Sequence, residues 1–262
     1  MSGMGRWEIQ DSDERTRRAK TFGAEAESYD DHRPDYPLAA VRWALEPLHE
    51  PASPRVLDLA AGTGKLTGVA LAAGTHVTAV EPDEAMRAVL HQHHPRVPVL
   101  DGTAESIPLP SNSVDAVFVG QAFHWFDPPR AFPEIARVLR LGGVLAAFWY
   151  DTDTSVEWVA ELDRISRSSA SLPRPSRQIL PSDPRFTPFE HSVFPHYHLR
   201  TAESLTATIG TQSHTLVITP AERTALLARV SAFLQTMPET AAGPFEVPLR
   251  TEVIRATRLS SE

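Results

Sequence analysis

The segment 56–67, VLDLAAGTGKLT, contains the residues whose types and spacing most directly indicate ligand chemistry. The apolar run 55–60 is expected to form a buried strand, and a helix is expected to begin at Lys65. Between them, Gly62 and Gly64 let a ligand approach the backbone where side chains would clash. Unbonded N–H groups at the start of the helix would point at the same ligand. The segment therefore predicts a cofactor-binding turn.

Two classes of phosphate-binding turn fit these residues poorly. A P-loop needs a glycine five residues before its Gly-Lys pair and Ser or Thr after the lysine, but this chain has Leu59 and Leu66 there. A dinucleotide-binding turn needs a third glycine for close helix–strand packing, and Thr67 stands at that position. The P-loop reading fails, and an NAD-dependent oxidoreductase on a similar fold remains an alternative.

The segment from Asp58 to Gly64 resembles the first motif of the class I S-adenosylmethionine-dependent methyltransferases. Ala60 stands where that family often has glycine, and because a methyl group is small we expect the substitution to be tolerated. The resemblance implies that Asp58, Ala60, Gly62 and Gly64 contact the cofactor.

The segment 80–86, VEPDEAM, is similar to the second motif of the same family. Glu81 ends the second expected strand, where a carboxylate can accept hydrogen bonds from both ribose hydroxyls of an adenosyl group. The resemblance implies that Pro82 and Met86 flank the adenine, and methionine offers a flexible apolar surface for a flat ring.

The segment 101–110, DGTAESIPLP, resembles the family's third-strand segment, which holds the amino edge of the adenine. Thr103 stands where many members have aspartate. The remaining contacts are then expected from the backbone at Ala104 and Glu105.

The segment 113–127 resembles the family's fourth strand and its exit, and 137–145 resembles the turn before the fifth. Ligands of open α/β sheets lie beyond the carboxyl ends of the strands, so Gly120 and Gln121 are expected at the cofactor. His124 is either a base or substrate-orienting group or a hydrogen-bonded structural histidine. Trp125 either lines the substrate site, with a cation–π contribution to the sulfonium, or packs in the core.

Phe22, Tyr29 and the segment RP-x-YP, which begins at Arg33, form a pattern that resembles the lid of small-molecule methyltransferases. These include methyltransferases similar to trans-aconitate methyltransferases. The resemblance implies that Tyr29 closes over cofactor and substrate. It also implies that Arg33 pairs with the methionyl carboxylate of the cofactor.

The composition excludes several chemistries. The 262 residues include no cysteine, so disulfides, thiolate metal sites and cysteine nucleophiles are ruled out, and Lys20 and Lys65 are the only lysines. A net charge of −8 disfavours nucleic-acid binding. No apolar run approaches the ~18 residues of a membrane span, and no signal peptide is visible. We therefore expect a soluble cytoplasmic protein with no membrane or nucleic-acid partner.

Strand and helix patterns alternate through 55–150, which predicts a doubly wound, Rossmann-like α/β fold with a mostly parallel sheet. We expect one domain with N-terminal helices and a lid in 1–54, a cofactor-binding core in 55–150, and a small helical cap with completion of the sheet in 151–262. Within the last part, 244–259 alternates like an edge strand or an antiparallel strand pair.

The predicted function is S-adenosylmethionine-dependent methyl transfer to an O, N or carboxylate nucleophile of a small molecule, with S-adenosylhomocysteine as product. A non-catalytic S-adenosylmethionine-binding domain is a further alternative. No metal is expected, because His91, His93 and His94 are better explained as residues at an exposed helix end. The oligomeric state and the four histidines between 191 and 214 are left unassigned.

Overall fold

The computed structural model describes residues 33–49, 52–171 and 179–260. The lid residues Phe22 and Tyr29 lie outside the described residues. Within the described part of the chain, no helix is long and apolar enough to cross a membrane.

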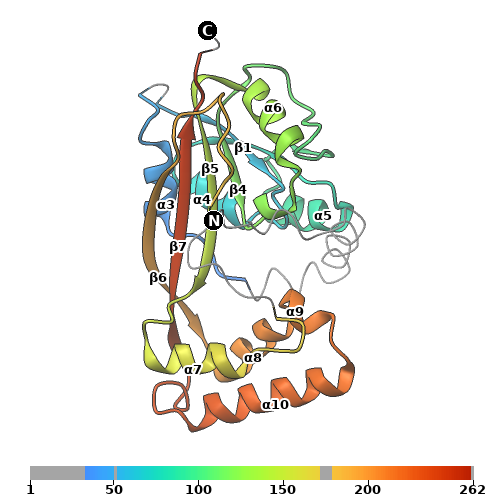
Figure 1. Ribbon diagram of the computed structural model, residues 1–262, viewed down its shortest axis with the longest axis vertical. Helices are drawn as coiled ribbons and strands as arrows, with labels where there is room; N and C mark the ends of the chain where they lie inside the picture. The colour runs from blue at the N-terminus through green and yellow to red at the C-terminus, as the bar shows by residue number, and fades with distance from the viewer. Residues whose placement is uncertain (1–32, 50–51, 172–178, 261–262) are drawn as a thin grey trace, which may run out of the picture.

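A seven-stranded sheet organises these residues, with the order β3-β2-β1-β4-β5-β7-β6 (Figure 1). Strands β1 to β5 pair in parallel, and β7 runs antiparallel to both β5 and β6. The mostly parallel, doubly wound α/β fold with an antiparallel last strand is therefore confirmed. The strands are β1 (Arg55–Leu59), β2 (His76–Val80), β3 (Val99–Leu100), β4 (Val114–Gly120), β5 (Leu139–Thr152), β6 (Glu190–Arg200) and β7 (Phe245–Thr257).

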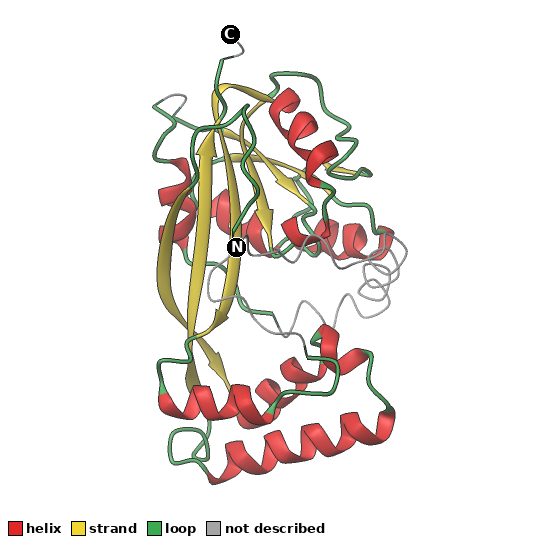
Figure 2. Cartoon of the chain, viewed as in Figure 1, coloured by secondary structure: helices red, strands yellow, loops and turns green. Residues whose placement is uncertain are grey.

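Helices connect the parallel strands and pack on both sides of the sheet (Figure 2). The helices that precede or connect β1 to β5 are α3 (Leu38–Leu45), α4 (Lys65–Ala72), α5 (Glu84–His93), the 3-10 turn η2 (Phe123–Trp125) and α6 (Pro128–Val138). The helices of the cap are α7 (Glu157–Ile165), α8 (Ala202–Gly210), α9 (Ser213–Leu216) and α10 (Pro220–Thr236).

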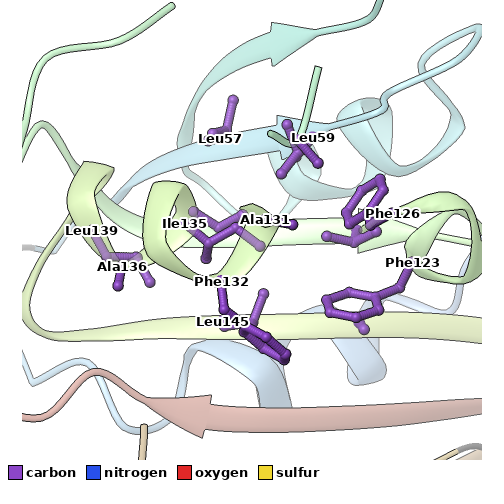
Figure 3. Close-up of a cluster of buried hydrophobic side chains, with 14 of the residues drawn as sticks. Leu57, Leu59, Phe123, Phe126, Ala131, Phe132, Ile135, Ala136, Leu139 and Leu145 are labelled. Carbon is purple, nitrogen blue, oxygen red and sulfur yellow. The ribbon is translucent and has the colours of Figure 1, made fainter. Parts of the chain in front are cut away.

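Two hydrophobic clusters fix the sheet between its helix layers. On one side, called the α6 face, Phe132 and Ile135 of α6 pack with Leu145 of β5 and Phe123 of η2 (Figure 3). On the other side, called the α3 face, Val41 of α3 and residues of α4 pack against the alternate residues of the same strands. Burial of these side chains from water holds the carboxyl ends of the strands in register.

The long strands β5, β7 and β6 continue past the carboxyl end of β4 and carry the cap (Figure 1). Gly120, the last residue of β4, is in register with Phe148, whereas β5 continues to Thr152, which pairs with Leu249 of β7. A third apolar cluster then joins Leu249 and Val247 to α7, α8 and α10. The cap therefore stands on the α3 face, beyond the edge at which ligands of this fold bind.

The expectation of an edge strand or strand pair over 244–259 is wrong. This segment forms the single strand β7, which lies inside the sheet between β5 and β6. Apolar and polar residues alternate in its first half because the cap covers one face of the strand there and the other face is open. The edge strand next to β7 is β6, which the sequence pattern missed because histidines, Tyr197 and Pro195 interrupt its apolar alternation.

Candidate active site

The glycine turn after β1 has the left-handed backbone that its composition indicates. Gly62 has φ +57° and Gly64 has φ +92°. A side chain on Gly62 would meet nothing within 4 Å, so open space lies over this residue. A Cβ on Gly64 would lie 2.9 Å from Cγ of Leu90 and 3.0 Å from the ring of His94. Gly62 thus borders open space, whereas Gly64 permits close packing of α4 on α5.

Two strained residues mark the same edge of the sheet. Among the described non-glycine residues, Ala60, Gln121 and Asn112 have positive φ, and the first two follow β1 and β4 directly. Left-handed backbone costs an alanine about 1 kcal/mol or more, and such strain clusters at functional sites. The tolerance expected at Ala60 therefore has an energetic cost, because a left-handed backbone favours glycine over alanine.

Glu81 lies just after β2 with its carboxylate bridging two backbone segments. Its Oε2 accepts the N–H of Gly62 at 2.9 Å, and its Oε1 accepts the N–H of Asp83 at 2.9 Å. Burial raises the pKa of this carboxyl above its ordinary value, and the two N–H groups oppose that shift. A carboxylate has about four acceptor positions, so Glu81 can hold the turn and still accept from ligand hydroxyls.

Asp58 is buried at the end of β1, with its Oδ2 accepting a 2.6 Å hydrogen bond from the Thr67 hydroxyl. Burial raises the pKa of its carboxyl to about 7, the hydrogen bonds from Thr67 oppose that rise, and the nearby Glu81 adds to it. Thr67 therefore has a specific function at the position where dinucleotide-binding turns have glycine.

The residues of the glycine turn fit a ligand that carries hydroxyl groups and a positive charge. Oδ1 of Asp58 and the Thr63 hydroxyl are buried and form no hydrogen bond to another described residue. Buried polar atoms in native proteins nearly always have partners. An acidic oxygen, a hydroxyl and the open space over Gly62 thus lie around one glycine turn, and all three suit a ligand with hydroxyls and positive charge.

The residues expected around the adenine follow β2 and β3. Met86 is buried in the first turn of α5, while Pro82 and Thr103 are exposed. Ala104 is buried, and the Glu105 carboxylate accepts the N–H of Asp127 at 2.9 Å at the start of α6. Glu105 therefore ties the loop after β3 to the exit of β4.

The exit of β4 is crowded by an aromatic side chain that the sequence patterns did not single out for this position. A Cβ on Gly120 would lie 2.7 Å from the Tyr36 hydroxyl, so glycine is required for this approach. The Tyr36 ring also packs edge-on against Phe148 and Tyr150. Gln121 donates from Nε2 to the Tyr150 carbonyl at 2.9 Å. These contacts join the end of β4 to the extension of β5.

His124 and Trp125 follow β4, as expected, and lie in the 3-10 turn η2 with ring centroids 4.6 Å apart. Both side chains are half-buried, and Trp125 also packs against the α6-face cluster. Trp125 therefore has at least the core-packing function that was its alternative. His124 lies at the ligand edge of the sheet.

The segment before α3 reaches the cap. Arg33 Nη2 lies 3.5 Å from the carbonyl oxygen of Thr211, just after α8. Asp35 pairs with Lys65 of α4 at 3.6 Å, next to the glycine turn. The same Asp35 also lies close enough to influence His198 of β6 electrostatically. This segment therefore connects the cofactor side of the sheet to β6 and the cap.

A cavity of the molecule lies away from the glycine turn. It has a volume of about 650 Å³ and sits at the amino ends of β1 and β2, between Arg55, His76 and Pro98. This is the opposite edge from the glycine turn, so it takes no part in the candidate site. Within the described residues, no cluster of three His, Asp or Glu side chains could hold a metal.

The fold and the glycine turn define a class I methyltransferase architecture, and comparison with known proteins agrees. A family model described as a methyltransferase domain matches residues 57–147. An uncharacterized methyltransferase of Mycobacterium tuberculosis is 41% identical over 238 residues, covering 90% of this chain and 95% of the relative. The chain belongs to the class I S-adenosylmethionine-dependent methyltransferases, and S-adenosylmethionine is its cofactor.

Other relatives and solved structures place the chain in the same family. A malonyl-[acyl-carrier protein] O-methyltransferase of Pectobacterium atrosepticum is 33% identical over 161 residues, or 59% of this chain and 62% of that protein. A solved structure assigned as a type II methyltransferase, from Anaeromyxobacter dehalogenans, superposes with a TM-score of 0.66 at 29% identity, covering 87% of this chain and 99% of that one. The alternatives of an NAD-dependent oxidoreductase and a non-catalytic binding domain are therefore set aside.

Alanine substitutions at the two turn glycines should separate cofactor binding from stability. Gly64→Ala is expected to lower the free energy of unfolding by about 2–4 kcal/mol, from left-handed strain and overpacking against Leu90. Gly62→Ala should cost only about 1–2 kcal/mol but place a methyl in the open space and weaken S-adenosylhomocysteine binding at least tenfold. Urea unfolding and calorimetric titration of both variants measure the two effects. Equal losses of stability would contradict this division.

Proposed function

We propose that this enzyme transfers the methyl group of S-adenosylmethionine to an oxygen of a small molecule by in-line displacement. The cofactor supplies a methyl group already activated on a sulfonium, so the protein chiefly positions the acceptor and excludes water. The observation that carries the proposal is the cap, which stands beyond the carboxyl ends of β1 and β4 on the extended strands. A cap at this place can enclose a small acceptor.

The cofactor is proposed to lie along the carboxyl ends of β1, β2 and β4. Glu81 would accept from the ribose hydroxyls, and Met86, Pro82, Thr103, Ala104 and Glu105 would surround the adenine. Asp58 and the backbone from Ala60 to Gly64 would face the methionyl part, together with Gly120 and Gln121. In this division, 55–150 is the cofactor-binding core, with the lid in 1–54 and the cap in 151–262.

An oxygen acceptor is favoured by one relative and by the polar groups of the site. The Pectobacterium relative is named a malonyl-[acyl-carrier protein] O-methyltransferase. On this chain, the α3 face beyond the carboxyl edge carries hydroxyl and imidazole groups, among them the buried Tyr36 and Thr251 and the half-buried His196. Groups of this type recognise oxygen-bearing molecules by hydrogen bonds.

Two measurements test the proposed function. S-adenosylmethionine or S-adenosylhomocysteine at 100 times its Kd should add about 2.7 kcal/mol to the free energy of unfolding, and NAD should add nothing. Methyl-labelled S-adenosylmethionine is then incubated with pools of phenols, alcohols, carboxylic acids and amines, and with a protein extract. Labelled small-molecule ethers or esters are expected. Label found only in amines or in protein would contradict the proposal.

A further inference from the structure

Two polar atoms on the α3 face of the strand extension are buried without a partner. The Thr251 hydroxyl and Nε2 of His196 each form no hydrogen bond to another described residue, and Thr251 is 0% exposed. Thr251 of β7 pairs with Phe194, and the next residue on the same face of β6 is His196. The two side chains are therefore diagonal neighbours within mutual reach. Buried polar atoms without a partner are rare in native proteins, so two at one place call for a partner such as a water molecule or a ligand group.

This pair lies on a path of side chains that begins at the methyl-transfer edge. The Tyr36 hydroxyl covers Gly120 at the end of β4, and its ring lies 5.5 Å from that of Tyr150. Tyr150 in turn pairs with Thr251 across β5 and β7. An acceptor between the Tyr36 ring and His196 would therefore lie between the carboxyl end of β4 and the cap.

The ring of His196 is oriented by the backbone. Its Nδ1 lies 3.4 Å from the Phe194 carbonyl oxygen, a contact that favours the tautomer with the proton on Nδ1. In that tautomer Nε2 carries a lone pair and is a hydrogen-bond acceptor. A neutral imidazole with a buried, unused Nε2 can accept the proton of a hydroxyl group.

Burial favours the neutral form of His196. Burial lowers the pKa of His196, and the carbonyls of Phe194 and Asp35 oppose that shift. Burial lowers the pKa of the neighbouring His198 to about 4, and the charge of Arg200 adds to this shift. Lys65 and His196 lower it further, and the Asp35 carboxylate opposes the shift. The side chain is therefore in its basic form at neutral pH, on a face that also carries the ion pair of Asp35 and Lys65.

We propose that His196 is the general base for a hydroxyl acceptor, an alcohol or phenol, which Thr251 helps to hold by a hydrogen bond. The acceptor's O–H proton passes to Nε2 of His196 as its oxygen bonds to the methyl carbon. The carbon–sulfur bond of the cofactor breaks, and its electron pair stays on sulfur, which gives the methyl ether and S-adenosylhomocysteine. The imidazolium then loses its proton to water. The inference rests on the proposed function and narrows its substrate class.

The kinetic test uses a hydroxyl acceptor found with the labelled cofactor. His196→Asn is expected to lower kcat by about 10²- to 10⁴-fold with little change in KM. It should also remove the acid limb of the kcat–pH profile, which falls below the ordinary histidine pKa of 6.5. The matched control is His191→Asn on the same strand, because His191 points to the opposite face and lies 3.4 Å from Glu252. That control should keep both kcat and the profile.

A second test needs no turnover. Histidine-labelled protein saturated with S-adenosylhomocysteine is titrated with phenol and, separately, with benzoate, and the His196 ring resonances are followed by NMR. Phenol should shift them in the wild type and bind about five- to tenfold more weakly to Thr251→Val. That variant should be as stable as the wild type, because it removes a hydroxyl that has no partner.

The outcomes separate the two levels of inference. The assignment of His196 would be overturned if labelled ethers form and the His196→Asn variant is unimpaired. It would also be overturned if methyl esters form and benzoate shifts the His196 resonances more strongly than phenol. Either result would leave small-molecule methylation intact. Cofactor binding with no labelled small molecule from any pool would remove the proposed function, and this inference with it.

Discussion

Replacing Glu81 with alanine is expected to weaken S-adenosylmethionine binding by about 100-fold or more. The carboxylate is held in place by the N–H groups of Gly62 and Asp83 and has acceptor positions left for two ribose hydroxyls. Hydrogen bonds to a charged group contribute roughly 1.5–3 kcal/mol each, and 1.4 kcal/mol corresponds to a factor of ten in Kd. Glu81→Gln keeps the shape but turns an NH₂ group toward one of the two N–H donors, so an intermediate loss is expected.

Calorimetric titration with S-adenosylhomocysteine measures the loss, and thermal unfolding of the free protein shows whether the variant is folded. Asp115→Asn is the matched control. Asp115 is also a buried carboxylate, but it lies at the opposite edge of the sheet, where it accepts the Arg55 N–H at 2.7 Å and pairs with Arg140. The Asp115→Asn variant should be less stable than the wild type and bind S-adenosylhomocysteine with the same affinity. A folded Glu81→Ala protein with an affinity within twofold of the wild type would refute the ribose contact.

The half of the fold that contains β1 to β5 could be predicted because its signals are local. A buried strand, a glycine turn and a helix follow each other within 56–67, and an acidic residue ends the next strand at Glu81. Each signal depends on backbone conformation or on side-chain periodicity over a few residues. The parallel sheet then brings these segments to one edge without further information from the sequence.

The acceptor side could not be predicted, because it depends on pairing between distant segments. His196 and Thr251 are 55 positions apart in the sequence and become neighbours only through the antiparallel register of β6 and β7. Strand β6 alternates histidine, tyrosine and proline rather than purely apolar residues, so its periodicity was not recognised. Among the histidines of 191–214, the register alone separates His196 from His191, which faces the other side.

Two departures from the expected motifs have structural explanations. Thr67 replaces a glycine of the dinucleotide-binding pattern because its hydroxyl is needed by the buried Asp58. Ala60 stands where the resembled motif has glycine and has a φ of +58°, so the turn stores strain that the surrounding sheet must stabilise. Both positions lie within a few residues of Gly62, where the ligand is proposed to bind.

Cofactor affinity is expected to rise about tenfold between pH 6 and pH 8, because Asp58 must lose its proton to attract the positive charge of S-adenosylmethionine. Burial raises the pKa of Asp58 from 3.8 to about 7, so most molecules carry the neutral acid at pH 6 and the carboxylate at pH 8. In the free protein the same shift has the opposite consequence. The folded state binds this proton more tightly than the unfolded state, so the free energy of unfolding falls as pH rises from about 4 to about 7.

Calorimetry in buffers of different ionisation enthalpy should therefore detect proton release on binding near pH 7. Asp58→Asn can still accept the Thr67 hydrogen bond and should bind weakly at every pH, with no proton release. 5′-Methylthioadenosine has neither the ammonium nor the sulfonium, so its affinity should not follow this titration. If the wild type binds S-adenosylmethionine equally at pH 6 and pH 8, or if the Asp58→Asn protein keeps the pH dependence, the carboxylate is not the group that faces the cofactor's charge.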